Sequence, residues 1–337
     1  MKKKLIGLII GIFSLSAISG ASATELKLAT FEPPKAFIAS KILAAWATKV
    51  NQCSAGSLNV KMYAGGVLGS PPKQYDIVTS GVADISWTVL GYIGGQFPLS
   101  SVIELPFLTR TSKAGTTALN TLFNEGYLDK EMAGIKVIGL HSNPGYQIHM
   151  KETKVVKPAD FKGKKMRVPS KIAGTILKTL GATGVKVPAP GTSEALSKGV
   201  VDGTPFPYTA VGSFRLFDVT KYHTEVNITN ATFGLIMNED KFNSLPAGAQ
   251  ACINKFSGHE FGDWASGLID NQNAIMKNEI SKRDGHEIII ASDDVIAEYK
   301  KILAPIESNW LKEMSGKGLD GDAVLKRARQ IITAVEG

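Results

Sequence analysis

The stretch KGVVDG at residues 198–203 decides the fold, because the stretch SGVADI at residues 80–85 repeats its plan. In both, a helical segment is followed by a glycine, which can close a helix in the left-handed conformation, and then by an apolar strand. The two glycines are Gly81 and Gly199. The chain is therefore predicted to contain two halves with the same order of elements.

The segments around the first glycine alternate between strand and helix. Apolar residues alternate over residues 25–29 and 58–63, as in strands, and recur at helical spacing over 35–50 and 75–79. A third strand is expected over 82–87. This order of strand, helix, strand, helix and strand predicts a sheet with helices on its faces.

The second half follows the same order. Strands are expected over residues 164–168 and 184–188 and from residue 201 onward, with helices over 171–180 and 193–198 between them. Two such units predict an α/β protein with two lobes, each a mostly parallel sheet flanked by helices. Ligands of such sheets bind at the carboxyl ends of the strands, so a cleft between the lobes is expected.

Two further apolar, strand-like segments, 135–141 and 231–237, lie where the chain would pass between the lobes. Two crossings imply interleaved lobes and a hinge. We expect the first lobe to contain residues 24–144 and 233–272, and the second lobe to contain residues 145–232 and 273–337. The C-terminal third carries helical periodicity, and long helices are expected over 249–257, 260–282, 293–313 and 321–335.

Residues 1–23 are typical of a secretory signal. Three lysines precede an uncharged apolar run over 5–18, and Ala21-Ser22-Ala23 offers small residues for cleavage. The run is shorter than the ~20 residues that cross a bilayer. The mature chain is therefore expected in the periplasm.

Composition excludes several classes of protein. With 44% hydrophobic and 20% charged residues, the chain is an ordinary globular one rather than disordered or fibrous. The formal net charge of +8 raises the question of nucleic acid. The densest basic cluster, 162–167, has no interleaved aromatic residue, so we interpret its lysines as solvated and expect no nucleic-acid partner.

The two cysteines, Cys53 and Cys252, form no CxxC motif, and no histidine pair has metal-ligand spacing, so no metal site is predicted. The sequence alone leaves a disulfide and two buried thiols equally open. No GxSxG, phosphate-loop or GxGxxG motif occurs, so neither a catalytic residue nor a cofactor is predicted.

Arg167 is the most informative residue, because it ends a strand and should point toward the cleft. Its planar guanidinium matches a carboxylate in two parallel hydrogen bonds. A pairing with a neighbouring acid, or solvation, is the alternative. Trp87 and Phe206 end the third strands of the two lobes, where they belong either to the lobe cores or to the cleft. Further ring side chains expected in the cleft are Phe31, Tyr92 and Tyr208.

Several ordered motifs resemble TRAP-type solute-binding proteins of the DctP family. The central ones are KGKKMRVP at 162–169, LGA at 180–182 and EALSKGVVDG at 194–203. Similar motifs over the rest of the chain are GGVLG at 65–69, ELPF at 104–107, DDV at 293–295, WLKEM at 310–314 and KGLDG at 317–321.

The resemblance implies a type II two-lobe periplasmic binding protein that is not an enzyme. Such a protein closes around an organic acid and delivers it to a small and a large membrane subunit, driven by an ion gradient, usually sodium, rather than ATP. The arginine that holds the ligand carboxylate falls on Arg167, and a second polar residue falls by spacing near Gln147. We expect a monomer.

The same resemblance bears on the ligand. Many sugar-acid binders of the family carry Asn in a Gly-x-Glu-Asn-Pro run, which here reads GTPFP at 203–207, so Phe206 replaces the Asn. A sugar hydroxyl buried against Phe206 without a partner would cost ~1–3 kcal/mol. We therefore predict an organic monocarboxylate that is apolar or aromatic, or a 2-oxo or 2-hydroxy acid.

Three alternatives stay open at this point. An ABC-type binding protein shares the two-lobe plan, and a sensor module would present the ligand to a receptor. A periplasmic enzyme acting on a small acid would need a general acid or base near the arginine. The candidates for that role are His141, Glu104 and Glu194.

Overall fold

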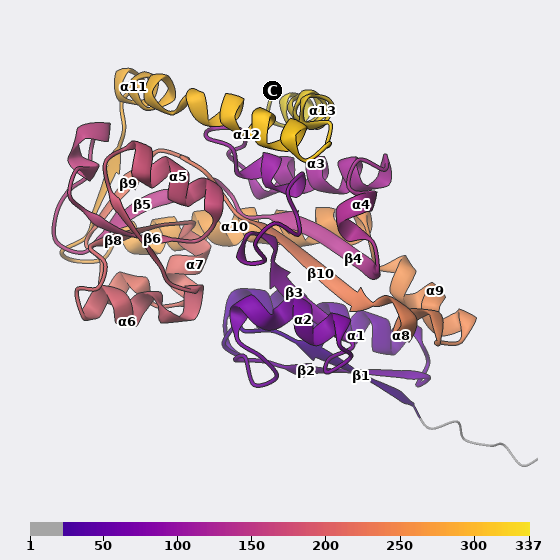
Figure 1. Cartoon of the computed structure of the whole chain (residues 1–337). Helices are drawn as coiled ribbons and strands as arrows, with labels where there is room; N and C mark the ends of the chain where they lie inside the picture. The colour runs from indigo at the N-terminus through magenta and orange to yellow at the C-terminus, as the bar shows by residue number, and fades with distance from the viewer. Residues whose placement is uncertain (1–22) are drawn as a thin grey trace, which may run out of the picture.

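The computed structural model describes residues 23–337, so residues 1–22 of the predicted signal segment lie outside it. Two sheets form two lobes (Figure 1). The first sheet has the order β2 (Leu58–Tyr63), β1 (Thr24–Ala29), β3 (Ile85–Val89), β10 (Thr232–Asn238), β4 (Ile135–Ser142). The second has the order β11 (Glu287–Ile290), β9 (Tyr222–Glu225), β5 (Gln147–Met150), β8 (Gly203–Phe206), β6 (Lys165–Val168), β7 (Thr183–Lys186).

The predicted repeat is confirmed by the strand order. The orders β2-β1-β3 and β7-β6-β8 are equivalent, and every pairing within them is parallel. The two glycines that led to this prediction both have left-handed φ angles, +75° at Gly81 and +68° at Gly199. A side chain would strain the backbone at both positions, which is why each helix exit carries glycine.

The strands that cross between the lobes pair differently. β10 runs antiparallel to β3 and β4, and β5 runs antiparallel to β8 and β9. Each sheet is therefore mostly parallel, with one reversed strand that follows a crossing between the lobes, β10 in the first sheet and β5 in the second. The two-lobe α/β class and the mostly parallel sheets are as expected.

Helices flank both sheets, and Figure 1 shows α5 and α6 on opposite faces of the second. The helices before the long crossing helix are α1 (Ala44–Cys53), α2 (Gln74–Thr79), α3 (Ser112–Asn124), α4 (Asp129–Met132), α5 (Lys171–Thr179), α6 (Thr192–Ser197), α7 (Tyr208–Ser213), α8 (Glu239–Asn243) and α9 (Ala247–Lys255). A π-helical turn, Ile38–Leu43, precedes α1. The crossing helix α10 (His259–Ser281) packs against α3, β4 and α7, so it contacts both lobes.

The C-terminal helices are α11 (Asp293–Leu303), α12 (Pro305–Gly316) and α13 (Gly321–Glu336). The single helix expected over 293–313 is two helices, because Pro305 has no N–H and begins a new helix instead of continuing the old one. α11 packs on α5, whereas α13 packs along α3 of the first lobe (Figure 1). The last helix thus lies with the first lobe rather than with the second, where we had expected it.

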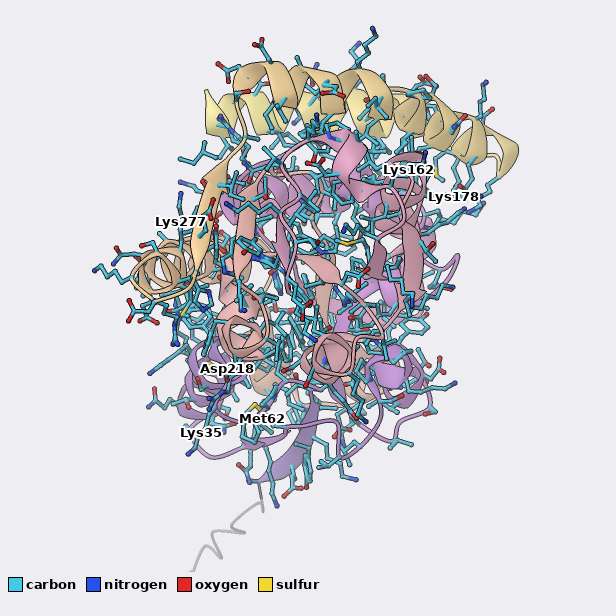
Figure 2. The ribbon with its side chains drawn as sticks, turned by 90° about the vertical axis from the view of Figure 1, so that its left-hand side faces the viewer. Lys35, Met62, Lys162, Lys178, Asp218 and Lys277 are labelled. Atoms are coloured by element: carbon cyan, nitrogen blue, oxygen red, sulfur yellow. A yellow bond between two sulfur atoms is a disulfide. The ribbon has the colours of Figure 1, made fainter. Side chains whose placement is uncertain are left out.

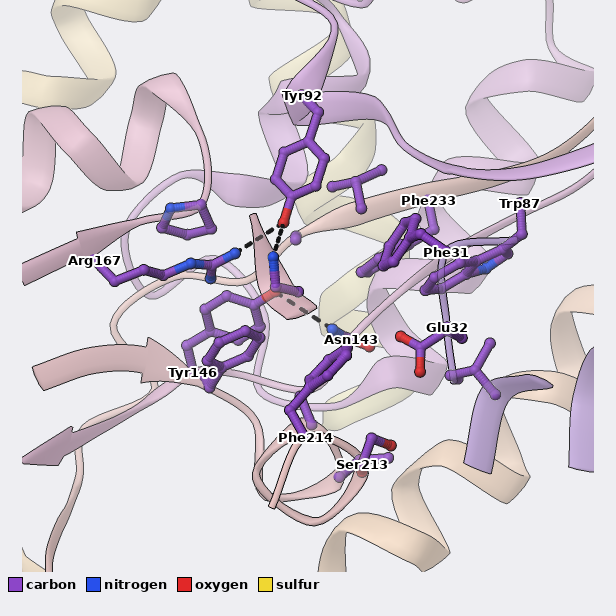
Figure 3. A pocket seen from close by; sticks show the side chains of 18 residues that line it. Phe31, Glu32, Trp87, Tyr92, Asn143, Tyr146, Arg167, Ser213, Phe214 and Phe233 are labelled. Carbon is purple, nitrogen blue, oxygen red and sulfur yellow. Dashed lines mark hydrogen bonds between the residues drawn. The ribbon is translucent and has the colours of Figure 1, made fainter. Parts of the chain in front are cut away.

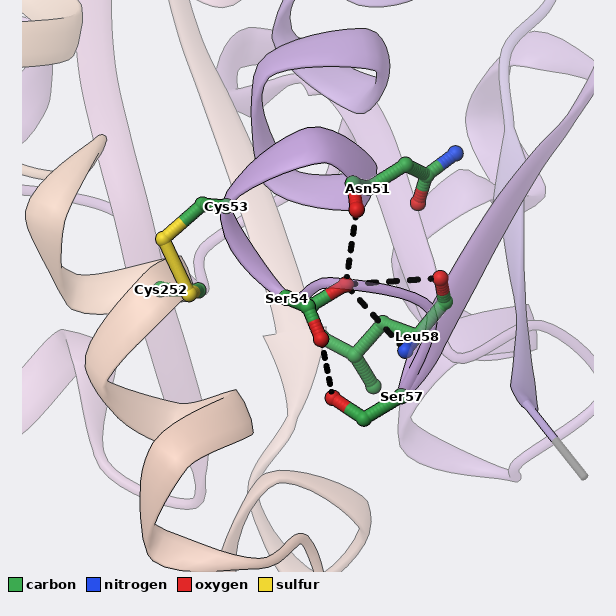
Figure 4. The surroundings of a disulfide bond; sticks show 6 residues. All are labelled: Asn51, Cys53, Ser54, Ser57, Leu58 and Cys252. Atoms are coloured by element: carbon green, nitrogen blue, oxygen red, sulfur yellow. Dashed lines mark hydrogen bonds between the residues drawn. A yellow bond between two sulfur atoms is a disulfide. The ribbon is translucent and has the colours of Figure 1, made fainter. Parts of the chain in front are cut away.

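A disulfide joins Cys53 at the end of α1 to Cys252 in α9, with Cα atoms 5.7 Å apart (Figure 4). The sequence alone left a disulfide and two buried thiols equally open, and the structure has the disulfide. Both helices lie beside the first sheet, so this disulfide links elements within one lobe and does not bridge the two lobes.

The lysines and the arginine of the basic cluster at 162–167 differ in exposure, as predicted. Lys162 and Lys165 are exposed, while Arg167 is buried. Figure 2 shows Lys162 and Lys178 extending outward from the second lobe. Among the described residues, no helix is both long and apolar enough to cross a membrane.

Candidate ligand-binding site

A pocket lies between the lobes at the carboxyl ends of β3, β6 and β8 (Figure 3). Aromatic side chains dominate its lining, which includes Phe31, Glu32, Trp87, Tyr92, Asn143, Tyr146, Arg167, Ala189, Phe206, Thr209, Phe214 and Phe233. The enclosed space is about 30 Å³. Because an apolar cavity that accepts benzene has about 150 Å³, a ring-bearing guest requires these walls to move apart.

Arg167 points into this pocket from β6 and is 1% exposed. Its Nε donates to the carbonyl oxygen of Val187 at 2.8 Å, and its Nη2 donates to the hydroxyl of Tyr92 at 2.8 Å. Nη1 has no partner, and no acid within residues 23–337 pairs with the guanidinium. A buried cation without a counter-ion is strongly destabilising, and an external anion would supply the missing charge.

The remaining hydrogen-bonding capacity of Arg167 faces the pocket. Two of the five guanidinium N–H groups are used by Val187 and Tyr92, which leaves the pair on Nη1 and one on Nη2. The guanidinium carbon lies 4.3 Å from the ring centroid of Phe206, which supports the plane of the cation from one face. The edge that carries Nη1 and Nη2 can therefore hold a carboxylate by two hydrogen bonds.

Tyr92 connects the two lobes. It lies in the 3₁₀ turn Leu90–Tyr92 that follows β3 of the first lobe. Its hydroxyl oxygen accepts from Arg167 and also from the backbone N–H of Ala189, at 3.0 Å, and both of these residues belong to the second lobe. The contact therefore exists only when the lobes are together.

An aromatic stack forms the far wall of the pocket. The rings of Trp87 and Phe233 are 4.8 Å apart and nearly parallel, and Phe31 lies 5.0 Å from Trp87. The indole N–H of Trp87 donates to Nε2 of His141 at 2.8 Å. Burial lowers the pKa of His141 to about 4, so its Nε2 is available as an acceptor at neutral pH. Trp87 therefore offers a guest only an apolar surface.

Asn143 and Tyr146 also line the pocket, although nothing in the sequence singled them out. They lie in the short connection between β4 and β5, where the chain crosses between lobes. The amide of Asn143 donates to the hydroxyl of Tyr146 at 3.3 Å, and burial raises the pKa of that phenol. Together they supply polar atoms close to Arg167, as Figure 3 shows.

Glu32 is a second titratable group in the lining that the sequence analysis missed. It directly follows Phe31 and is 3% exposed. Burial raises the pKa of Glu32 to about 8. The signal that could have drawn attention to it is its place beside Phe31 in the FEPP break after the first strand.

Gln147 and Tyr208 are not among the residues that line the pocket. The Gln147 amide is satisfied by backbone and side-chain groups of Gly145, Val226 and Asn227 at 2.7 to 3.1 Å. The Tyr208 hydroxyl donates to Glu225 at 3.2 Å. Of the seven candidate residues, the structure thus brings together Phe31, Trp87, Tyr92, Arg167 and Phe206.

The three residues considered as a general acid or base also lie outside the lining. Glu104 accepts from the hydroxyl of Thr232 at 3.1 Å, and burial raises its pKa. Glu194 is exposed and forms an ion pair with Lys198. His141 accepts from Trp87, as described above. The arrangement therefore gives none of them a route to a bound acid.

Comparison with known families agrees with this geometry. Residues 28–313 match the model of DctP, the bacterial extracellular solute-binding proteins of family 7. The chain belongs to this family. This TRAP-type solute-binding protein has the two-lobe type II fold. The match also decides against the ABC-type alternative.

Three solved structures illustrate the similarity. A TRAP solute-binding protein from Rhodoferax ferrireducens T118, in complex with copurified benzoate, is 30% identical and has a TM-score of 0.88, over 93% of this chain and 98% of its own. One from a marine metagenome, specific for aromatic acids and bound to 3-hydroxybenzoate, is 32% identical with a TM-score of 0.89 over the same shares. A periplasmic one from Bordetella bronchiseptica with bound mandelate is 26% identical, with a TM-score of 0.86 over 93% of this chain and 99% of its own.

These neighbours and the family place the chain in a functional class. They are extracellular or periplasmic proteins that bind solutes for transport rather than enzymes. The ligands bound in the three structures are small acids that carry a ring. The pocket of this solute-binding protein combines the unpaired edge of a buried guanidinium with ring-lined walls.

Proposed function

We propose that this protein captures a small aromatic monocarboxylate in the periplasm and delivers it to the membrane subunits of a TRAP transporter. The observation that carries the proposal is the buried guanidinium of Arg167, whose Nη1 has no partner inside a pocket of aromatic rings. A ligand carboxylate would supply the missing anion, and Phe206 and the Trp87 stack would contact the ring.

The composition of the pocket, to which both lobes contribute, supports a closing motion. The first lobe supplies Phe31, Trp87 and Tyr92 to the pocket, and the second lobe supplies Arg167 and Phe206. Only the closed form makes all contacts, so a ligand shifts the population toward it. This gives the membrane subunits a shape difference by which to recognise the loaded protein.

The apolar lining also bears on which acids are excluded. Phe206 stands where sugar-acid binders of the family carry a hydrogen-bonding Asn, and it is covered by the guanidinium and by Tyr146. A uronic or sialic acid would leave hydroxyl groups without partners there. The ring of an aryl acid has no hydrogen bonds to lose on entering, and its carboxylate exchanges water for the guanidinium; the three structural neighbours with ring acids agree with this choice.

A thermal-shift panel of benzoate, 3-hydroxybenzoate, mandelate, pyruvate and galacturonate tests the ligand class. The aryl acids should raise the melting temperature of the purified protein, because a ligand at 100 times its Kd stabilises by about 2.7 kcal/mol. Arg167→Ala should abolish this effect while the protein stays folded. The control, Arg215→Ala, removes an exposed arginine that pairs with Asp218 and should change nothing. Stabilisation by galacturonate alone, or unchanged binding by Arg167→Ala, would contradict the proposal.

Delivery is tested separately. Membrane vesicles that contain the small and the large subunits should take up the acid only when the binding protein and a sodium gradient are both present. Uptake that requires ATP would contradict the TRAP partner and favour an ABC-type transporter. Uptake that is independent of the binding protein would contradict the transport role and favour a sensor function.

A further inference from the structure

Glu32 is held rigidly at the edge of the pocket. Its backbone N–H donates to the hydroxyl of Thr30 at 3.2 Å, and its carbonyl oxygen accepts from the N–H of Gly65 at 2.8 Å. Pro33 and Pro34 follow it and restrict the backbone further. The backbone that carries the Glu32 side chain is therefore fixed by the fold.

The carboxyl group of Glu32 has no partner of its own. The side chain lines the pocket at 3% exposure, and its Oε2 forms no hydrogen bond to any of the described residues 23–337. Buried side-chain oxygens in proteins nearly always have a partner. An unpartnered one that faces a ligand pocket is therefore a candidate contact for the ligand itself.

Glu32 and Arg167 lie at different ends of the pocket. In Figure 3, Arg167 enters from one side, and Glu32 lies across the cavity beside Phe31 and Trp87. Burial alone raises the pKa of Glu32, and Arg167 does not offset the effect. At neutral pH the group is therefore largely an uncharged carboxylic acid, which offers both an O–H donor and a carbonyl acceptor.

Resting on the proposed function, we propose that Glu32 is a specificity-determining residue that hydrogen-bonds a hydroxyl or carbonyl substituent of the ligand, at the end remote from the carboxylate on Arg167. The pocket then recognises two features of one small molecule, a carboxylate at one end and a neutral polar group at the other. The rings between them contact the body of the molecule without polar discrimination.

This arrangement predicts a preference for substituted acids over the parent compound. A site that holds a polar group for a substrate hydroxyl disfavours the analogue without it, because the buried group is then left unpaired. A hydroxylated benzoate with its hydroxyl within reach of Glu32 should bind more tightly than benzoate. Substitution of the carboxyl by an apolar side chain should remove the difference.

Isothermal titration of benzoate and of 2-, 3- and 4-hydroxybenzoate tests the inference. The wild-type protein should bind at least one hydroxybenzoate about 3- to 10-fold more tightly than benzoate, the range of one neutral hydrogen bond. Glu32→Gln keeps a donor and an acceptor and should keep the preference. Glu32→Leu should reduce it below about 2-fold while benzoate binds at least as well. The control is Glu152→Leu on the exposed surface, which should behave as wild type.

The outcomes separate the two proposals. If Glu32→Leu retains the wild-type preference, the role of Glu32 is refuted and the capture of aryl acids stands. If 3-(aminomethyl)benzoate binds more tightly than every hydroxybenzoate and depends on Glu32, the residue is a counter-ion and the inference is likewise overturned. If the wild-type protein binds none of these acids, the proposed function itself fails. Glu32→Met replaces Glu32→Leu if circular dichroism shows that the latter is unfolded.

Discussion

The hydroxyl oxygen of Tyr92 lies 2.8 Å from Nη2 of Arg167, and the two side chains come from opposite lobes. The same oxygen accepts from the backbone N–H of Ala189 in the second lobe. Tyr92 therefore orients the guanidinium that we propose as the carboxylate anchor and also joins the lobes. Opening the lobes breaks both of its hydrogen bonds, so we expect ligand binding and closure to be coupled through this hydroxyl group.

Tyr92→Phe should weaken binding and favour the open form. The substitution removes the acceptor for Arg167 and Ala189 and keeps the ring, so we expect a loss of about 10- to 150-fold in benzoate affinity, in the range of one charge-assisted hydrogen bond. Calorimetry gives the affinity, and X-ray scattering should show a larger radius of gyration than for wild type. Tyr63→Phe, whose hydroxyl contacts Glu25 on the surface, is the control. Wild-type affinity and radius in Tyr92→Phe would show that the contact is incidental.

Three histidines form a directed hydrogen-bonded chain behind the pocket. Nε2 of His149 lies 2.9 Å from the carbonyl oxygen of Phe206, so this nitrogen must donate. Nδ1 of the neutral ring then accepts from Nδ1 of His223 at 2.8 Å, and Nε2 of His223 accepts from Nδ1 of His286 at 3.0 Å. Burial lowers the pKa of His149 to about 4 and that of His223 to about 2.

The fold should therefore lose stability in mild acid. Because folding lowers these pKa values, the unfolded chain binds more protons than the folded chain does at acidic pH. The stability that neutral His149 and His223 contribute to the folded state is fully present above pH 6.5. It is lost as the pH falls from 6.5 toward 4, by about 1.4 kcal/mol of unfolding free energy per pH unit for each proton. Urea unfolding between pH 4 and pH 7 measures the slope.

His223→Asn should reduce that slope by roughly one proton, whereas His259→Asn, outside the chain of histidines, should leave it unchanged. Equal slopes in wild type and His223→Asn would show that the buried histidines do not control the acid response of the protein.

Hydrophobic periodicity and glycine positions predicted the repeated halves of the chain, but they did not predict three short strands of the second sheet. β5, β9 and β11 contain four residues each and, unlike the equally short β6, β7 and β8, stand outside the strand-helix alternation that marked the repeat. They are strands because neighbouring strands pair with them, which is a property of the assembled sheet and not of the segment. The mixed pairing of both sheets was invisible for the same reason.

The candidate site was predictable where strand ends decide it. Arg167, Trp87 and Phe206 lie at or near such ends and do line the pocket. Tyr208 does not, because α7 begins there and turns Thr209 and Ala210 toward the pocket instead. That rotation depends on where the helix starts, to within one residue, which a sequence pattern does not fix.

Glu32→Gln should stabilise the protein at alkaline pH. Because burial raises the folded-state pKa of Glu32 from 4.5 to about 8, its contribution is fully present below pH 4.5 and is lost as the pH rises toward 8. The uncharged Gln avoids this loss, so the difference in unfolding free energy between variant and wild type should grow from pH 5 to pH 8. Urea unfolding of both proteins at several pH values measures it. A difference that is constant with pH would mean that Glu32 titrates normally.

Loss of the disulfide should lower stability without changing binding. Cys53 and Cys252 are 199 positions apart, and closing so long a loop in the unfolded chain contributes up to about 5 kcal/mol in the chain-entropy model. The double variant Cys53→Ser, Cys252→Ser should therefore unfold at lower urea concentration. Because the bridge joins α1 to α9 within the first lobe, away from the pocket lining, benzoate affinity should stay within 3-fold of wild type. Dithiothreitol should bring the wild-type protein to the stability of the double variant and should leave the variant itself unchanged. A large loss of affinity in the double variant would instead show that the bridge supports the binding site through the first lobe.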